Sequence, residues 1–341
     1  MYLKKIFASI VLFSFYLTAS GGVQKTSFCE NKEEPCWPTE NKAFYQNKPL
    51  EDYIQPTASG KVLSGTYGCV RNYGTRFHEG IDIKPIKHNR KGEPLDKISA
   101  CLPGRVVYIN SNPGLSTYGR YLVLEHKEQG LIFYSLYAHL SQIQKKLHPG
   151  VFVHRGEIIG QMGHSSCSPI PKNRAHLHFE IGMKIGSKTS FETWYISQHF
   201  PSRNRHGEWN GMNLVGLDPL AFFKAKTSFL DFFKKQKTAF VLTVKTTKIP
   251  PFIRDNSSLC ENKIENITGW KIVFNWVGMP IKWTALTHKL PQTIRLDAYD
   301  KEELKQHGNR HTLEFDKKNN PFLGKILQRQ LFELFEEYFH L

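Results

Sequence analysis

The chain has 341 residues, enough for about two domains with a sizeable buried core. Its apolar content of 40% is ordinary for a globular protein, and its formal net charge of +16 makes it strongly basic. No Arg/Lys cluster alternates with stacking aromatic residues as in a recognisable nucleic-acid module, so we expect no nucleic-acid partner. The two remaining explanations of the charge are an anionic wall or envelope polymer as partner and a simply solvated basic surface.

Residues 1–21 have the order of a secretory signal peptide. Two lysines precede an apolar run over residues 6–17, and small residues follow it. The run is shorter than the ~20 residues that span a bilayer, so we expect cleavage near Ser20 or Gly21 rather than a stable transmembrane anchor. The sequence therefore predicts export through a signal peptide, to the periplasm or the cell envelope.

Six cysteines follow the signal peptide, an even number that permits up to three disulfides in an exported chain. They are Cys29, Cys36, Cys69, Cys101, Cys167 and Cys260. No Cys-x-x-Cys pair occurs, which argues against a zinc site made of thiolates. The pairing stays open, and buried free thiols are the alternative.

The chain up to about residue 225 is interpreted as a lead-in segment followed by one domain. Residues 22–60 are polar and interrupted by prolines, and we expect them to wrap the domain that follows. Residues 61–225 are rich in glycine, short β-type runs and turn signals, which predicts a mostly β domain. Asp218 and Pro219 are expected to begin a helix that closes it, as N-cap and first helical residue.

Residues 240–341 are expected to form a smaller mixed α/β region. Its terminal helix is expected to have one apolar face, which contains Phe322, Leu323, Ile326, Leu327, Leu331, Leu334, Phe335 and Tyr338. Glu333, Glu336 and Glu337 give this helix an acidic polar side, which favours core or interface packing over a membrane. A wall-binding or partner-binding module and a structural extension of the first domain are both open as the role of this region.

The stretch from Arg174 to Ile181 has the most informative pattern in the chain. Its side chains alternate between an apolar face (Leu177, Phe179 and Ile181) and a polar face (His176, His178 and Glu180). On a helix the two histidines would diverge by about 200°. The spacing therefore predicts a strand, with the apolar face in a core and the imidazole face lining a cleft.

Two segments upstream carry groups of matching chemistry. Residues 77–84 place His78 and Asp82 on one face of an extended segment, because a glycine, a proline and two isoleucines oppose a helix there. Residues 134–141 form an apolar strand that delivers His139 at its end. Each segment alone is explained by an incidental or structural histidine. Together with the His-x-His strand they suit a catalytic zinc, which needs three nitrogen or oxygen ligands, and they leave two histidines for acid–base work.

These segments resemble the lysostaphin/LytM-type zinc metallo-endopeptidases. The matching stretches are Phe77-His-Glu-Gly-Ile-Asp82, Tyr137-Ala-His-Leu-Ser141 and His176-Leu-His-Phe-Glu180, in the family's order, and the resemblance covers roughly residues 60–222. It implies an antiparallel β-sheet catalytic domain with a groove, one Zn²⁺ per chain, and hydrolysis of peptide bonds in the stems or cross-bridges of bacterial peptidoglycan.

Carried across position by position, the resemblance implies that His78, Asp82 and His178 are the zinc ligands. It implies that His139 and His176 are the catalytic pair beside the metal-bound water, without deciding which is the general base. Glu79 is not needed in this scheme and is expected to be exposed. Tyr73 is either a donor to the developing oxyanion or an ordinary loop residue.

The sequence departs from the family pattern around the expected groove. Residues 163–174 replace a glycine-rich segment, Ala175 stands in place of the usual proline, and residues 185–215 look like an insertion. These departures leave the scissile bond open. The alternative function is a catalytically silent envelope adaptor of the same fold, which binds the wall or activates another hydrolase. A further hypothesis, from position alone, is that residues 22–60 occlude the groove as an inhibitory segment.

Overall fold

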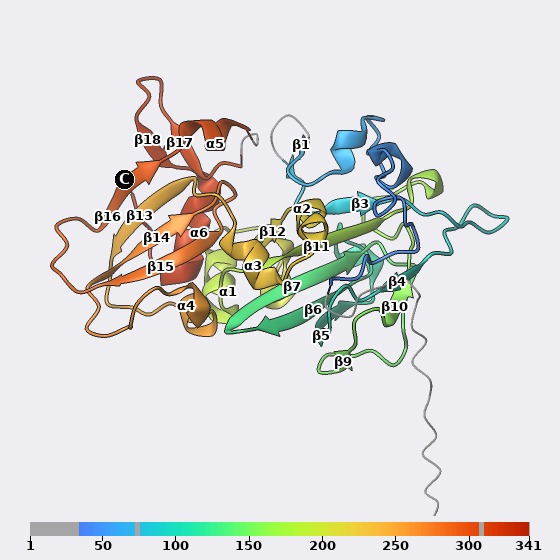
Figure 1. Cartoon of the computed structure of the whole chain (residues 1–341), viewed down its shortest axis with the longest axis horizontal. Coiled ribbons are helices and arrows are strands. Elements are labelled where there is room, and N and C mark those ends of the chain that lie inside the picture. The colour runs from blue at the N-terminus through green and yellow to red at the C-terminus, as the bar shows by residue number, and fades with distance from the viewer. Residues whose placement is uncertain (1–33, 72–75, 307–309, 341) are drawn as a thin grey trace, which may run out of the picture.

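The structure is a computed structural model, and it describes residues 34–71, 76–306 and 310–340. The predicted signal peptide, Cys29 and Tyr73 lie outside these residues. Figure 1 shows a fold made mostly of antiparallel strands, with a few short helices on their faces and between the two larger sheets. This confirms the predicted fold class, which is mostly β with antiparallel sheets.

The largest sheet carries the sequence patterns singled out above. Its strands, in spatial order, are β12 (Leu214–Leu217), β11 (Leu177–Lys184), β7 (Leu131–Ala138), β6 (Tyr121–Glu128), β5 (Gly104–Asn110) and β9 (Phe152–Val153), and β3 (Ile81–Ile83) pairs with β11 beside β12. The seven-residue stretch Leu177–Met183 is wholly buried, because both faces of β11 are covered. The predicted His-x-His strand is therefore central in the sheet.

Smaller elements flank this sheet. A three-stranded sheet contains β4 (Lys97–Ser99), β10 (Ile158–Gln161) and β8 (Gln142–Ile143), and a hairpin contains β1 (Val70–Arg71) and β2 (Arg76–Phe77). The helices are α1 (Lys188–Ser197), α2 (Pro219–Ala225) and α3 (Phe229–Lys234). Asp218 caps α2 as expected, since its carboxylate accepts hydrogen bonds from the backbone N–H groups of Leu220 and Ala221.

The region after residue 240 is built on a second antiparallel sheet. Its strands, in spatial order, are β15 (Pro280–Leu286), β14 (Gly269–Phe274), β13 (Phe240–Lys245) and β16 (Ile294–Tyr299). The other elements are α4 (Pro251–Asp255), α5 (Lys301–Gln306), the hairpin of β17 (Leu313–Phe315) and β18 (Pro321–Leu323), and α6 (Lys325–Phe335). Figure 1 shows α6 lying behind the sheet, with its other side toward the rest of the molecule.

The expected pattern of the terminal helix is wrong in two respects. The expected bounds are too wide, because Phe322 and Leu323 belong to β18 and Tyr338 lies beyond the helix, which begins after Gly324 and ends at Phe335. Glu333 does not lie on an exposed polar side, because it is 1% exposed. The reason is that α6 is covered on two sides. It packs against the C-terminal sheet, where Phe335 lies against Trp283, and against α1 through the buried side chain of Phe332.

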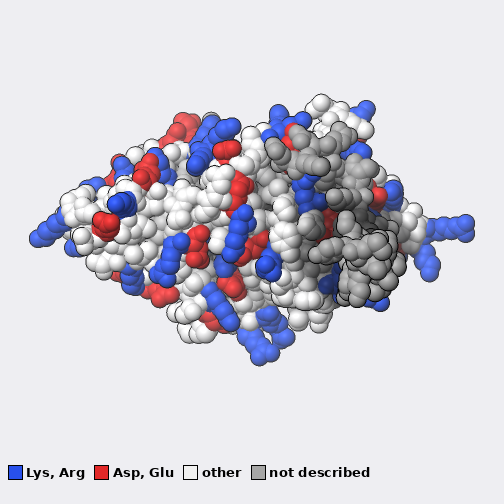
Figure 2. Space-filling view, turned by 60° about the horizontal axis from the view of Figure 1, so that its bottom comes forward, with Lys and Arg blue, Asp and Glu red and all other residues white. Residues whose placement is uncertain are grey.

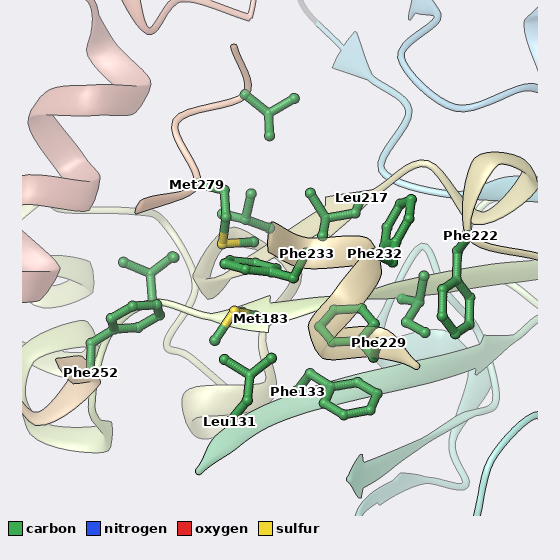
Figure 3. Close-up of a cluster of buried hydrophobic side chains, with 14 of the residues drawn as sticks. Leu131, Phe133, Met183, Leu217, Phe222, Phe229, Phe232, Phe233, Phe252 and Met279 are labelled. Atoms are coloured by element: carbon green, nitrogen blue, oxygen red, sulfur yellow. The ribbon is translucent and has the colours of Figure 1, made fainter. Parts of the chain in front are cut away.

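One hydrophobic core joins the two sheets. Figure 3 shows phenylalanines of α2 and α3 packed over β7 and β11 on one side and toward Met279 and Phe252 of the C-terminal region on the other. The rings of Phe133 and Phe229 stack with centroids 3.9 Å apart and planes 7° apart. The C-terminal region therefore buries apolar surface against the largest sheet and its helices.

The described part of the lead-in segment also enters this core. Trp37 is 1% exposed and stacks on Phe44 with ring centroids 4.7 Å apart. Ile54 pairs with Ile83 in a β-bridge, and the N–H of the next residue donates to the carbonyl oxygen of Asp82 at 2.8 Å. This segment therefore supports the strand that carries Asp82.

Four described cysteines have free thiols, namely Cys69, Cys101, Cys167 and Cys260, whereas Cys36 is disulfide-bonded. The alternative of buried free thiols therefore holds for Cys101, which is fully buried. Within residues 34–71, 76–306 and 310–340, no helix is both long and apolar enough to cross a bilayer.

Replacement of Phe229 by alanine tests the shared core. Phe229→Ala removes a ring that is 1% exposed and stacked on Phe133, so we expect the free energy of unfolding to fall by about 3–5 kcal/mol. Phe322→Ala is the control, because that ring is 41% exposed and its loss should change the free energy by about 0.5 kcal/mol or less. Chemical denaturation of the full chain measures both values, and equal small losses would contradict a shared core.

Candidate metal centre

Three neighbouring strands place the predicted site residues. Near its start, β11 lies between β3 and β7, and its register sets His178 opposite Asp82 on one side and opposite Ala138 on the other. Directly opposite residues project from the same face of a sheet, so the side chains of Asp82 and His178 meet. His139 follows Ala138 directly, and His176 lies one residue before β11.

His78 reaches this pair through a close approach of the turn between β2 and β3. A Cβ atom at Gly80 would lie 2.2 Å from the carbonyl oxygen of Phe179, so only glycine allows the turn to pack this tightly against β11. The Nδ1–H of His78 donates to the carbonyl oxygen of Thr66 at 2.7 Å. The imidazole is thereby held with Nε2 facing the other two residues.

The three side chains present one ligand atom each to a common point. Nε2 of His78 lies 3.0 Å from Oδ1 of Asp82 and 3.1 Å from Nδ1 of His178. The remaining distance, from Nδ1 of His178 to Oδ1 of Asp82, is 3.0 Å, and all three residues are buried. Two imidazole nitrogens and one carboxylate oxygen at these separations fit a divalent cation of the Zn²⁺ type.

The charges at this centre also suit a cation. Burial opposes ionisation of Asp82, but the neighbouring His78 and His176 and the hydrogen bonds from the histidines outweigh it and hold its pKa well below the usual value. His178 has a carboxylate at each ring nitrogen, and despite its burial these contacts raise its pKa to about 9. A proton on His178 thus occupies the place of a cation, and metal binding would displace it.

Glu180 orients His178 from the side away from the common point. Its Oε1 accepts a hydrogen bond from Nε2 of His178 at 2.8 Å, and its two oxygens accept from the hydroxyl groups of Tyr118 at 2.6 Å and Tyr134 at 2.9 Å. The carboxylate is 0% exposed. A carboxylate at the far nitrogen of a ligand histidine fixes the ring and raises its basicity.

Arg71 orients Asp82 as Glu180 orients His178. One terminal nitrogen of its guanidinium lies 3.0 Å from Oδ2 of Asp82, which leaves Oδ1 turned to the histidines. Neither Arg71 nor Glu180 was predicted as a site residue. For Glu180 the signal was present, because it shares the imidazole face of the strand. For Arg71 there was none, because its contact joins segments that no local pattern connects.

His139 and His176 lie side by side next to the three ligand candidates. Their ring centroids are 4.6 Å apart, and Nε2 of His176 is 3.6 Å from Oδ1 of Asp82. Each Nδ1–H donates to a backbone carbonyl oxygen, that of Ser165 at 2.9 Å for His139 and that of Arg174 at 2.7 Å for His176. Burial lowers both pKa values, so both rings are neutral near pH 7. The structure thus brings all five predicted site residues together.

These side chains open into a groove of about 600 Å³. The two sequence departures flank it as expected, residues 163–174 through Ser166 and Ile170 and the insertion at 185–215 through His206 and Met212. Arg310 and Arg329 of the C-terminal region also line it. That contribution was not predicted, because it depends on how the two sheets pack.

Glu79 was expected to be exposed, and this expectation is wrong. Its side chain is 13% exposed, forms an ion pair with Arg310, and accepts a hydrogen bond from the N–H of Gly216 at 3.2 Å. The cause is the C-terminal region, which covers the turn next to His78 and supplies the arginine.

A comparison with known protein families finds one match in this part of the chain. Residues 76–190 match the model of peptidase family M23. The match contains all five site residues and confirms the resemblance inferred from the three motifs. None of the curated proteins matches the chain.

Several solved structures are similar to the chain over part of its length. A zinc containing peptidase from Vibrio cholerae is 26% identical over 38% of this chain, with a TM-score of 0.27, and the chain spans 33% of its length. The catalytic domain of lysostaphin from Staphylococcus simulans is 19% identical over 51% of this chain and 95% of its own, with a TM-score of 0.29. The catalytic domain of the M23 protein EnpA from Enterococcus faecalis is 21% identical over 38% of this chain and 81% of its own, with a TM-score of 0.27.

Replacement of Glu180 by glutamine tests how the centre is supported. Glu180→Gln removes the charge that receives the hydrogen bond from His178, so we expect zinc affinity to fall about 10–100-fold. Tyr134→Phe removes only one hydrogen bond to the other carboxylate oxygen and should cost less. Competition with a chromogenic chelator measures both affinities, and an unchanged affinity in Glu180→Gln would show that this carboxylate does not support His178.

Proposed function

We propose that the chain is a zinc metallo-endopeptidase that hydrolyses peptide bonds in bacterial peptidoglycan, in the stem or the cross-bridge. The observation that carries the proposal is the convergence of His78, Asp82 and His178 on one point, with His139 and His176 beside it. The M23 family match over residues 76–190 supports the reaction class.

One Zn²⁺ per chain would be held by Nε2 of His78, Oδ1 of Asp82 and Nδ1 of His178. When bound, it supplies a Lewis acid that acidifies water and polarises the carbonyl group of the peptide. Arg71 and Glu180 keep the ligand atoms of Asp82 and His178 directed at the metal position. The protein's contribution at this point is therefore a rigid and charge-balanced set of donors.

His139 and His176 then handle the proton and the charge that develops on the peptide. In both rings Nδ1 carries a hydrogen donated to a backbone carbonyl, so Nε2 is the nitrogen able to accept a proton. One ring receives the proton of the attacking water on Nε2 and, now protonated, stabilises the negative charge of the tetrahedral intermediate through that Nε2–H, while Nε2 of the other ring accepts a hydrogen bond that orients the water. Both rings are neutral before the reaction, as this scheme requires.

Localisation in the periplasm or cell envelope is part of the proposal. It is supported by the signal-peptide pattern of residues 1–21 and by the basic composition. Figure 2 shows lysine and arginine side chains spread over the visible face, with acidic side chains between them. Such a surface suits attraction to an anionic wall or envelope polymer without requiring a specific site.

The alternative, a catalytically silent adaptor that binds the wall or activates another hydrolase, is less well supported. A silent adaptor has no need to preserve the ligand set, its supporting carboxylate and the two further histidines together. All of these positions are filled here. For residues 240–341, the shared core supports a structural extension over a separately mobile wall-binding module.

Two histidine replacements separate metal binding from turnover. His178→Ala should lose both zinc and activity, because it removes a ligand. His139→Ala should keep zinc but lose turnover by at least about 10²-fold, because it removes a proton-transfer group. His148→Ala is the control, since that residue is exposed and outside the groove.

Zinc is measured by elemental analysis, and turnover by digesting purified sacculi and identifying the released fragments by mass. Zinc retained in His178→Ala, or peptidoglycan hydrolysis retained in either variant, would contradict the assigned roles. The masses also identify the bond that is cleaved. A zinc-loaded protein that releases nothing from sacculi would instead favour the adaptor.

A further inference from the structure

The groove at the metal centre is not built by the peptidase domain alone. Arg310, just before β17, and Arg329, on α6, line the same groove as the five site residues. Both belong to the C-terminal region, outside the part of the chain that matches the peptidase family. The C-terminal region therefore adds two positively charged side chains to the groove.

The charge balance of the groove points to an anion. Five arginines and three acidic residues line the groove. Each of the three acidic side chains already has hydrogen-bond or ion-pair partners within the protein. Asp82 contacts Arg71 and the histidines, Glu180 accepts from His178 and two tyrosines, and Glu79 pairs with Arg310. The cationic side chains therefore exceed the carboxylates available to balance them.

Arg310 is fixed in place beside the metal centre. Its guanidinium carbon lies 4.3 Å from the ring centroid of Phe77, and the group forms an ion pair with Glu79, so it contacts both chain neighbours of His78. The side chain is 7% exposed, and its Nε–H has no hydrogen-bond acceptor among the described residues. One carboxylate partner leaves a guanidinium with unused donors.

Arg329 is held in a similar way but is less well neutralised. Its guanidinium carbon lies 5.4 Å from the ring centroid of Trp194 on α1, and its Nε is 3.4 Å from Oε1 of Glu333. Neither this Nε nor the two carboxyl oxygens of Glu333 form a hydrogen bond within the described part of the chain. Burial raises the pKa of Glu333 to about 8, so near pH 7 this carboxyl group is mostly protonated and leaves the arginine's charge in place.

We propose that Arg310 and Arg329 form a binding site for a carboxylate of the substrate, so that the groove selects an acidic peptide. A planar guanidinium binds a carboxylate through two parallel hydrogen bonds, and stacking on an aromatic ring holds it ready to do so. A largely buried charge without a full set of partners is costly, and a substrate carboxylate supplies the missing acceptors. The inference rests on the proposed function, because it takes the groove to be where the peptide lies.

Binding without turnover tests this inference independently of hydrolysis. The probes are fluorescently labelled cross-linked stem peptides, with carboxylates either free or converted to amides. The protein is the full zinc-loaded chain carrying His139→Ala, and fluorescence anisotropy gives the dissociation constants. We expect the free carboxylate form to bind at least about ten-fold more tightly, a ratio equal to about 1.4 kcal/mol.

A double variant then removes Arg329 together with its acidic neighbour Glu333, so that no unpaired acid is left. Arg329→Gln combined with Glu333→Gln should weaken binding of the carboxylate form about ten-fold and leave the amide form unchanged, so that the preference disappears. Arg295→Gln is the matched control, because this exposed arginine pairs with Asp297 on the distant strand β16. It should keep the full preference.

Equal binding of the two probes, or an equal loss for both in the double variant, would overturn the carboxylate site. If the double variant loses its cooperative thermal transition, Arg329→Lys carries the test, since it keeps the charge but loses the paired donors. It should then reduce the preference without abolishing it, and an unchanged preference would again overturn the site. Hydrolysis of the two peptides by the chain with His139 intact separately tests the proposed function, whose failure would leave these binding ratios measurable.

Discussion

The antiparallel register between β3 and β11 is the constraint on which the rest of the site depends. It sets Asp82 directly across from His178, and opposite residues in such a pair lie only a few ångströms apart. A slip of one residue would turn either side chain to the other face of the sheet. The register is secured from outside the site as well, because Ile54 of the lead-in segment pairs with Ile83 and covers the edge of β3. The geometry of the candidate metal ligands is thus a property of strand pairing rather than of a flexible loop.

The site also depends on the buried polar groups satisfying one another's hydrogen bonds and charges. His78 is tied to a backbone carbonyl, Asp82 to Arg71, and His178 to Glu180, whose own oxygens are taken up by tyrosines. Because each group has a partner, the centre tolerates two carboxylates and several imidazoles in a buried position. The same partners hold the rings in single orientations, so the donor atoms need little rearrangement when a cation binds.

The sequence predicted well those parts of the fold and site that rest on local periodicity or on motif chemistry. The alternation around His176 and His178 predicted the strand and its polar face, and the Asp-Pro pair predicted the start of α2. The errors concern contacts between distant segments. Glu79 is covered by Arg310 and Glu333 by α1, and neither covering element can be inferred from the pattern at the covered residue. A helix with apolar residues along one face gives no sign that its polar face is also buried. The contact of Arg71 with Asp82 was not predicted for the same reason, since only the folded chain brings the two residues together.

The contacts around His78 also bear on whether the two regions of this chain can be separated. Phe77 lies against Trp276 and Arg310, and Glu79 is paired with Arg310, so both neighbours of a ligand histidine touch the C-terminal region. Without the C-terminal region, the largest sheet would have an uncovered aromatic ring at Phe77 and an unpaired acid at Glu79 beside the candidate metal centre. The two halves of this chain are therefore expected to be inherited and to diverge together.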